Sequence, residues 1–171
     1  MLDKLLSQHQ IDVSNIEVTG CYYHLNTNYE TSKTIEGIYR FKPNECPYCT
    51  NQNSKMFKLY KYQTVKIKLK SEPILPTVLA LKKPAFKCLH CMRNFNSQVD
   101  FVDKHCNISN DLKDYIFELL QVRPKLSHKQ ISMKTHVSQN RIAYLNTLLK
   151  EQNIKESYSQ ITDCDFSYNV L

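Results

Sequence analysis

The stretch Cys46-Pro47-Tyr48-Cys49 decides the fold of this 171-residue chain together with its counterpart Cys88-Leu89-His90-Cys91, because each is a Cys-x-x-Cys motif. Thiolates are the softest ligands that a protein offers, and two such motifs supply the four that a tetrahedral zinc ion takes. Four sulfur ligands leave no coordination position for water or substrate, so the site would be structural. We therefore expect one Zn²⁺ to be held by Cys46, Cys49, Cys88 and Cys91.

Other uses of the seven cysteines fit the sequence less well. An odd number of cysteines, with no signal-peptide layout at the start, favours reduced thiols over a disulfide framework, which stays open as an alternative. A thioredoxin-like redox role is disfavoured because neither motif opens a helix of a βαβ unit. His90, His105 or Cys106 could replace one thiolate, but we expect all three to lie outside the metal site. Cys21 and Cys164 have no partner at ligand spacing.

The segments around and between the two motifs are rich in Val, Ile, Thr, Tyr and Phe, which is typical of β-strands. In the run 64–69, apolar residues alternate with lysines, so this strand would have one apolar and one cationic face. The expected elements are a short amphipathic helix near residues 2–10, a hairpin of 16–25 with 33–41, and further strands at 56–62, 64–69 and 77–81.

After residue 105 the apolar residues recur at helical spacing. We expect a first helix from Asp111, a second with Ser127 as its N-cap and a third with Ser138 as its N-cap. The short turn between the second and third helices contains no glycine, so His136 or a neighbour must adopt a positive φ there. This pattern predicts a helix-turn-helix.

Together these patterns predict an α+β protein, in which a β-rich zinc ribbon is followed by a three-helix helix-turn-helix domain. The ribbon would occupy residues 1–105 and the DNA-binding helices residues 106–155. The order of residues 156–171 is left open.

Positive charge is concentrated in two middle segments of a chain whose formal net charge is +7. Residues 55–95 hold ten Lys or Arg and one acid, and residues 112–150 hold seven Lys or Arg and two acids. Such segments suit a polyanion, although a solvated surface would have the same composition. The lysines expected to contact DNA phosphates are Lys66, Lys68, Lys70, Lys82, Lys83, Lys87 and Lys129.

The third helix is the one expected to enter the major groove, because the early side chains of such a helix reach base edges. Asn and Gln can pair with adenine, and Arg with guanine. The candidates for base contact are Gln139, Asn140, Arg141 and Tyr144. The alternative is a three-helix core whose outer face is simply polar.

An interaction module is a different hypothesis for the ribbon, which would then dock a protein or stack single-stranded RNA on aromatic side chains. Most of the aromatic residues in question alternate with apolar positions, so we expect them in the core. They are Tyr48, Phe57, Tyr60, Tyr62 and Phe86.

The chain resembles the N-terminal region of IS-L-three family insertion-sequence transposases over roughly residues 10–150. The resemblance is carried by Cys46-Pro47-Tyr48-Cys49, by the approach Lys82-Lys83-Pro84-Ala85-Phe86-Lys87 to the second motif with Phe95 beyond it, and by Leu126-Ser127-His128-Lys129-Gln130-Ile131 leading to Val137-Ser138. In that family a zinc ribbon and a helix-turn-helix precede a long catalytic domain with a DDE carboxylate triad.

The resemblance implies recognition of double-stranded DNA at terminal inverted repeats in the bacterial cytoplasm. Two inverted ends would suit a homodimer. Asp163 and Asp165 lie too close together for a DDE triad, and we expect no catalytic residue, no enzyme activity and no small-molecule substrate. A standalone regulator or transposition inhibitor with the same DNA grip is the alternative. No apolar run approaches the ~18 residues of a membrane span, so no membrane partner is expected.

Overall fold

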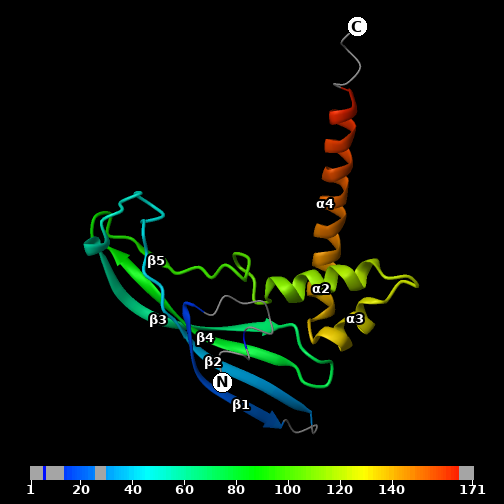
Figure 1. The fold of residues 1–171 in the computed structure, drawn as a ribbon, viewed down its shortest axis with the longest axis horizontal. Helices are drawn as coiled ribbons and strands as arrows, with labels where there is room; N and C mark the ends of the chain where they lie inside the picture. Colours follow the sequence, from blue (N-terminus) through cyan, green and yellow to red (C-terminus); the bar gives the residue numbers. More distant parts are fainter. Residues whose placement is uncertain (1–5, 7–13, 26–29, 166–171) are drawn as a thin grey trace. The chain divides into compact units, whose positions relative to one another are not determined.

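The computed structural model describes Leu6, residues 14–25 and residues 30–165, with side chains described as far as residue 154. Its architecture is mixed α+β, with a five-stranded sheet followed by three helices (Figure 1), which confirms the predicted class. Apart from Leu6, the helix expected near residues 2–10 lies outside the described residues. The chain divides into two compact units, Met1–Leu112 and Lys113–Leu171.

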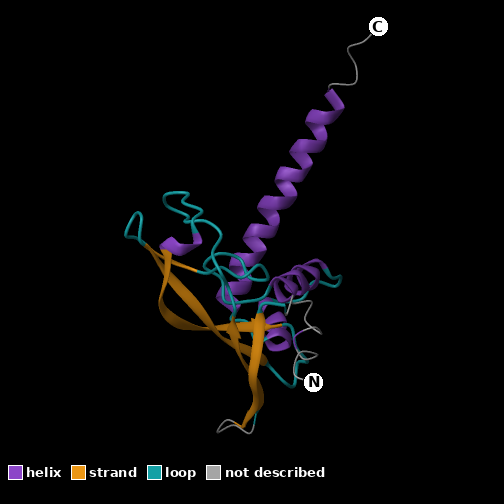
Figure 2. Ribbon diagram, turned by 60° about the vertical axis from the view of Figure 1, so that its left-hand side comes forward, coloured by secondary structure: helices purple, strands orange, loops and turns teal. Residues whose placement is uncertain are grey.

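The sheet of the first unit has the strand order β1-β2-β4-β3, and β5 pairs with β4. The β1–β2 hairpin is antiparallel, as predicted, and β3–β4 is also antiparallel, whereas β2 and β4 run parallel. Figure 2 shows the strands as one layer, with the loops that carry the cysteine motifs at one end. The strands are β1 (Ile16–Leu25), β2 (Thr31–Tyr39), β3 (Phe57–Leu69), β4 (Thr77–Cys88) and β5 (Asn94–Asn96).

Two strands of the structure, β3 and β4, are longer than the runs expected from the sequence. The runs 56–62 and 64–69 form one strand, β3, in which an irregularity between Leu59 and Lys61 is absorbed without ending the ladder. β4 continues through Pro84 because the carbonyl of Pro84 accepts from the Ser97 N–H (3.1 Å), on the edge away from β3. The nitrogen of Pro84 faces that same edge, so no hydrogen bond to β3 is lost.

The register gives the sheet an apolar inner face, and β3 carries lysines on the opposite face. Ile35, Leu79 and Ile67 lie side by side on the inner face, where they pack with Leu6 and with Val99 and Val102 from the segment after β5. The alternation predicted for 64–69 is confirmed, because Ile67 and Leu69 are buried while the lysines between and beside them face the other way.

The segment that follows β5 belongs to the first unit. Its residues reach β3 through a bridge between Lys68 and Ile108, with hydrogen bonds from the Lys68 N–H to the Asn107 carbonyl (2.8 Å) and from the Ser109 N–H to the Lys68 carbonyl (2.9 Å). These contacts agree with the extent of the first unit, Met1–Leu112.

The helices are α2 (Asn110–Gln121), α3 (His128–Thr135) and α4 (Gln139–Asp165). Ser127 caps α3 as predicted, in a reciprocal capping box with Gln130. The turn before α4 is closed by His136 in the left-handed region (φ 55°), which also confirms the sequence analysis. α4 begins directly after Ser138 and continues to Asp165, beyond the predicted end of the domain at residue 155. Ile131 of α3 is buried together with Ile142 and Leu145 of α4.

Candidate metal centre

The two cysteine motifs, 42 positions apart, converge on one point. The four Sγ atoms of Cys46, Cys49, Cys88 and Cys91 all lie within 4.8 Å of one another. Those of Cys46 and Cys91 are 3.7 Å apart, and those of Cys49 and Cys88 are 3.8 Å apart. In a tetrahedron of Zn–S bonds of ~2.3 Å, two sulfurs lie about 3.8 Å apart. The four cysteines can therefore hold one metal ion, and their geometry is consistent with zinc.

The same distances exclude disulfides within the cluster, because a disulfide brings its sulfurs to ~2.05 Å. The six cysteines whose side chains the structure describes are all free thiols. His90, His105 and Cys106 do not belong to the cluster, as the sequence analysis expected. Cys106 packs instead against the apolar core of the sheet, where Cys21 also lies.

The two motifs fold in the same way. In the first, the Cys46 N–H donates to the Asn51 carbonyl (2.9 Å) and Thr50 has a positive φ of 54°. In the second, the Cys88 N–H donates to the Arg93 carbonyl (2.9 Å) and Met92 has a positive φ of 60°. Each loop thus turns back at the fourth residue after its first cysteine and directs both sulfurs inward. The repeated geometry makes the two loops equivalent halves of one site.

Strand ends hold the second motif in place. Cys88 is the last residue of β4 and lies opposite Phe57, the first residue of β3. The short 3-10 turn η1 (Ser54–Met56) precedes β3, and its Met56 carbonyl accepts from the Leu89 N–H (2.8 Å). The motif is therefore fixed by the ladder between the two longest strands.

An aromatic cluster, which the sequence did not predict as a unit, packs against the sulfurs. The rings of Phe86 and Phe95 are 5.9 Å apart, Phe57 meets Phe95 edge-on at 5.9 Å, and Phe41 lies 6.2 Å from Phe86. These rings pack with the fully buried Cys46 and Cys88. The packing keeps water from one side of the sulfurs. The Arg93 guanidinium of the second loop lies over the Tyr48 ring of the first, 5.3 Å from its centroid.

The thiols of the cluster do not ionise together. Burial raises the pKa of Cys46, but the backbone N–H groups of Tyr48 and Cys49 outweigh it and hold that pKa at about 7. At Cys49 the backbone N–H of Asn51 lowers the pKa, whereas burial and the three neighbouring sulfurs raise it to about 12. A divalent cation among the sulfurs removes this conflict, because it stabilises thiolates in place of protons.

The predicted phosphate-contacting lysines do not all share one surface. Lys66 and Lys68 extend from the outer face of β3, and Lys82 of β4, opposite Thr64, extends from the same face. We call these three residues with Lys70 the lysine strip. Lys83 lies on the inner face instead, since neighbouring strand residues point to opposite sides. The half-buried Lys87 lies opposite Lys58 near the metal end, and Lys129 is an exposed residue of α3 in the other unit.

The residues predicted to contact bases occupy the first turns of α4. Gln139 and Asn140 are exposed, and Tyr144 is about half exposed. The guanidinium of Arg141 lies over the Tyr144 ring at 5.0 Å from its centroid, so the two side chains are held together.

The aromatic residues of β3 correct one expectation. Phe86 is buried and Phe57 is half-buried, but Tyr48, Tyr60 and Tyr62 are 53%, 55% and 49% exposed. The irregularity at Leu59–Lys61 shifts the alternation, so the pattern of apolar neighbours does not decide which tyrosines are covered. For Tyr60 and Tyr62 the sequence signal of exposure was Lys61, which lies between them.

Comparisons of the chain with protein-family models, with curated proteins and with solved structures give no match. No helix in the part of the chain that the structure describes combines the length and the apolarity needed to cross a membrane. What the chain does must therefore be inferred from the residues themselves.

Proposed function

We propose that this chain is a double-stranded DNA-binding protein, in which a structural Zn²⁺ stabilises a zinc ribbon and a helix-turn-helix reads the sequence. The binding would be sequence-specific and non-catalytic. The observation that carries the proposal is the α3–turn–α4 unit with an exposed, hydrogen-bonding N-terminal end of α4.

The α3–α4 unit has the features that groove reading needs. The capping box at Ser127 fixes the start of α3, and the left-handed His136 ends it with its N–H donating to the Ser132 carbonyl (2.8 Å). Only three residues separate the two helices, and α3 packs against α4. The first turns of α4 then present Gln139, Asn140 and Arg141, whose side chains can pair with adenine and guanine edges.

The zinc ribbon supplies a second, sequence-independent part of the interaction. The lysine strip lies on a sheet whose two longest strands are joined at the cysteine cluster. A rigid row of ammonium groups can neutralise successive phosphates and release their counterions. On this proposal the metal contributes to DNA binding indirectly, because it holds the ends of β3 and β4 together.

The resemblance to insertion-sequence transposases supports one kind of DNA target, the terminal inverted repeats of a mobile element. A repressor or transposition inhibitor would use the same surfaces. Adding the chain to a transposition assay of a related full-length transposase distinguishes an inhibitor from a component of transposition, since a competitor for the same ends depresses transposition.

Selection of bound duplexes from a random pool tests the central claim. The zinc-loaded chain should enrich one short consensus, repeated or palindromic if two copies bind together. Recovery of a pool no different from the input would contradict specific binding.

Metal content measured on the same preparation tests the zinc site. We expect one zinc per chain, retained in Cys106→Ser and lost in Cys88→Ser. The reason is that Cys88 belongs to the cluster and Cys106 does not. Equal metal content in both variants would contradict the assignment.

The exposed tyrosines favour a second candidate function, the binding of single-stranded nucleic acid. Tyr60 and Tyr62 are half exposed on β3, the strand that carries Lys66 and Lys68. Aromatic rings beside cations are the usual platform for unpaired bases. Tyr62→Ala should weaken binding of a single-stranded oligonucleotide and spare a duplex. A duplex that loses as much affinity as the single strand would count against this second function.

A further inference from the structure

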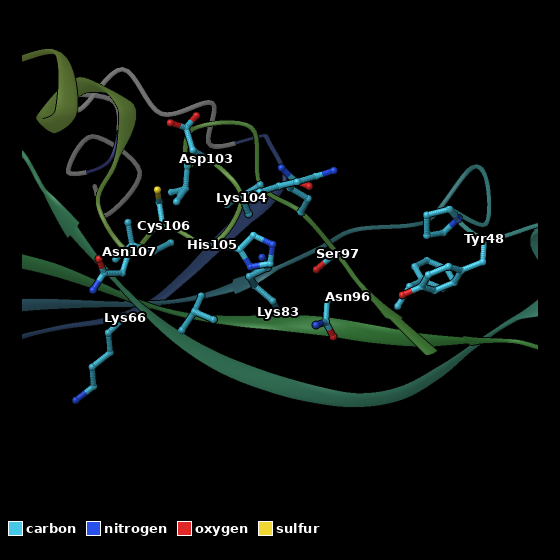
Figure 3. A pocket seen from close by; sticks show the side chains of 17 residues that line it. Tyr48, Lys66, Lys83, Asn96, Ser97, Asp103, Lys104, His105, Cys106 and Asn107 are labelled. Carbon is cyan, nitrogen blue, oxygen red and sulfur yellow. The ribbon is translucent and has the colours of Figure 1, made fainter. Parts of the chain in front are cut away.

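A pocket of about 730 Å³ opens on the inner face of the sheet, beside the first cysteine motif (Figure 3). Its walls are the inner face of β3 and β4, the segment 95–107, and Pro47 with Tyr48. All of these residues belong to the first compact unit. The volume lies in the range of small-ligand sites, which is about 300–1,000 Å³. Of the lysine strip, Lys66 alone contributes to the lining.

Lys83 brings a positive charge to the pocket. Its side chain is half-buried, and burial lowers its pKa because the charged ammonium loses water. Within the described ranges its ammonium forms no ion pair and no hydrogen bond with the protein. An anion in the pocket would supply the missing partner.

Ser97 brings a buried donor that is also unpartnered. The residue is 2% exposed, and its Oγ has no hydrogen-bond partner although it lines the pocket. Its backbone N–H donates to the carbonyl of Pro84 (3.1 Å), which fixes Ser97 next to Lys83. Buried hydroxyls are nearly always paired, so an orphan beside a half-buried cation indicates a ligand position.

Other polar groups surround the same point. Figure 3 shows His105 and Asn96 near Lys83 and Ser97, whereas Asp103 lies toward another end of the pocket. Asp103 is the one carboxylate of the lining, and it has an interaction of its own. Lys104 adds a further positive charge, and the side chain of Lys66 points away toward the opposite face. The lining is therefore net positive around Lys83.

We propose that this pocket binds a phosphate group, with the Lys83 ammonium and the Ser97 hydroxyl as its principal donors and His105 beside them. A phosphate offers several acceptor oxygens to donors that converge from different elements, and a charged oxygen forms stronger hydrogen bonds than a neutral one. The apolar lining from Val65, Phe95 and Val99, with Tyr48 at one end, leaves room for an organic group attached to the phosphate. The phosphate would belong to a mononucleotide or to the end of a nucleic acid strand.

Amide-resolved NMR titration of the full zinc-loaded chain with inorganic phosphate and with adenosine monophosphate tests the site. Saturable shifts are expected at Lys83, Ser97 and His105. Loss of a hydrogen bond to a charged group corresponds to about tenfold in affinity, so Lys83→Met and Ser97→Ala should each weaken binding by roughly that factor. Lys58→Met is the matched control, because Lys58 is exposed on the same sheet and does not line the pocket.

Titration with an oligonucleotide, with and without a 5′-phosphate, separates the two sources. A Lys83-dependent gain from the 5′-phosphate assigns the site to a strand end, whereas shifts with the mononucleotide and no such gain assign it to a small ligand. Absence of saturable shifts with every probe overturns the proposal, as does an equal loss of affinity in Lys58→Met. Zinc content and the dispersion of the NMR spectrum show whether each variant is folded. If Lys83→Met does not fold, Ser97→Ala tests the site independently.

Discussion

Thr50 shows how the metal loops are built at the scale of one residue. Its φ of 54° lies in the left-handed region, where a β-branched side chain is disfavoured by about 1–2 kcal/mol. The loop requires this conformation to return the Asn51 carbonyl to the Cys46 N–H. Met92 occupies the same position in the second loop.

Thr50→Gly should therefore stabilise the zinc-loaded protein. Removal of the strain outweighs the entropy that glycine loses on folding, and the net gain should be about 0.5–1 kcal/mol in the free energy of unfolding. Chemical denaturation measures it. Thr64→Gly is the control, because Thr64 lies in the extended strand β3 and the same change there should destabilise the protein. A loss of stability in Thr50→Gly would contradict the predicted loop strain.

Metal retention should depend on pH through the same loops. Zinc binds thiolates, so protons compete with it and its affinity must fall as the pH falls. In the metal-free cluster the pKa of Cys46 is lowered from 9.0 to about 7, which adds folding stability above pH 9 that is lost as the pH falls through about 7. The raised pKa of Cys49 lowers the folding stability of the metal-free protein above pH 9, because the thiol ionises there more readily in the unfolded chain than in the cluster.

Competition with a chelator at pH 6, 7 and 8 measures this dependence. We expect zinc to be lost most readily at pH 6 and the melting temperature of the zinc-loaded protein to fall with it. The metal-free protein at the same three pH values is the control for effects unrelated to zinc. A zinc affinity of the protein that does not fall with pH, once protonation of the chelator itself is taken into account, would argue against thiolate ligands.

At the scale of elements, Ser127 connects sequence to structure most directly. Its hydroxyl accepts from the Gln130 N–H, and the Gln130 side chain accepts from the Ser127 N–H. Ser127→Ala should cost about 1 kcal/mol of unfolding free energy and loosen the start of α3. Ser132→Ala, within the same helix, should cost less, because alanine favours helix interiors. Chemical denaturation measures the free energy of unfolding of both variants. Equal losses of that free energy would contradict a stabilising role for the Ser127 cap.

The elements that sequence predicted well are those set by local chemistry. The cap at Ser127, the left-handed His136 and the β1–β2 hairpin each depend on residues that are close in sequence. The parallel pairing of β2 with β4 depends on partners more than 40 residues apart, such as Ile35 and Leu79, and no local pattern specifies it.

The candidate site divides in the same way. The spacing of the cysteines predicted which four sulfurs meet, because ligand chemistry is written in the motif itself. The aromatic cluster was missed because Phe41 and Phe57 join it from different strand ends. Lys83 was grouped with Lys82, although neighbours in a strand face opposite sides, and this difference gives the pocket its cation.

For the whole molecule, the DNA-binding proposal assigns different work to the two units. The lysine strip of the first unit would contact phosphates, which every sequence presents equally. The start of α4 in the second unit would contact bases, which differ. The two contributions can therefore be separated by measuring affinity for a selected duplex and for a random duplex across a range of salt concentrations.

Lys66→Gln should weaken binding to both duplexes by a similar factor and reduce the dependence of log affinity on log salt by about one unit, since one phosphate contact is lost. Arg141→Ala should lower affinity for the selected duplex by roughly 1–3 kcal/mol, with little change on the random one, because a bidentate contact to guanine is lost. Lys42→Gln is the control for charge alone, because this exposed lysine lies outside both basic segments. If Arg141→Ala weakened both duplexes equally, Arg141 would be a phosphate contact. If Lys42→Gln matched Lys66→Gln, net charge and not the lysine strip would account for the electrostatic part of binding.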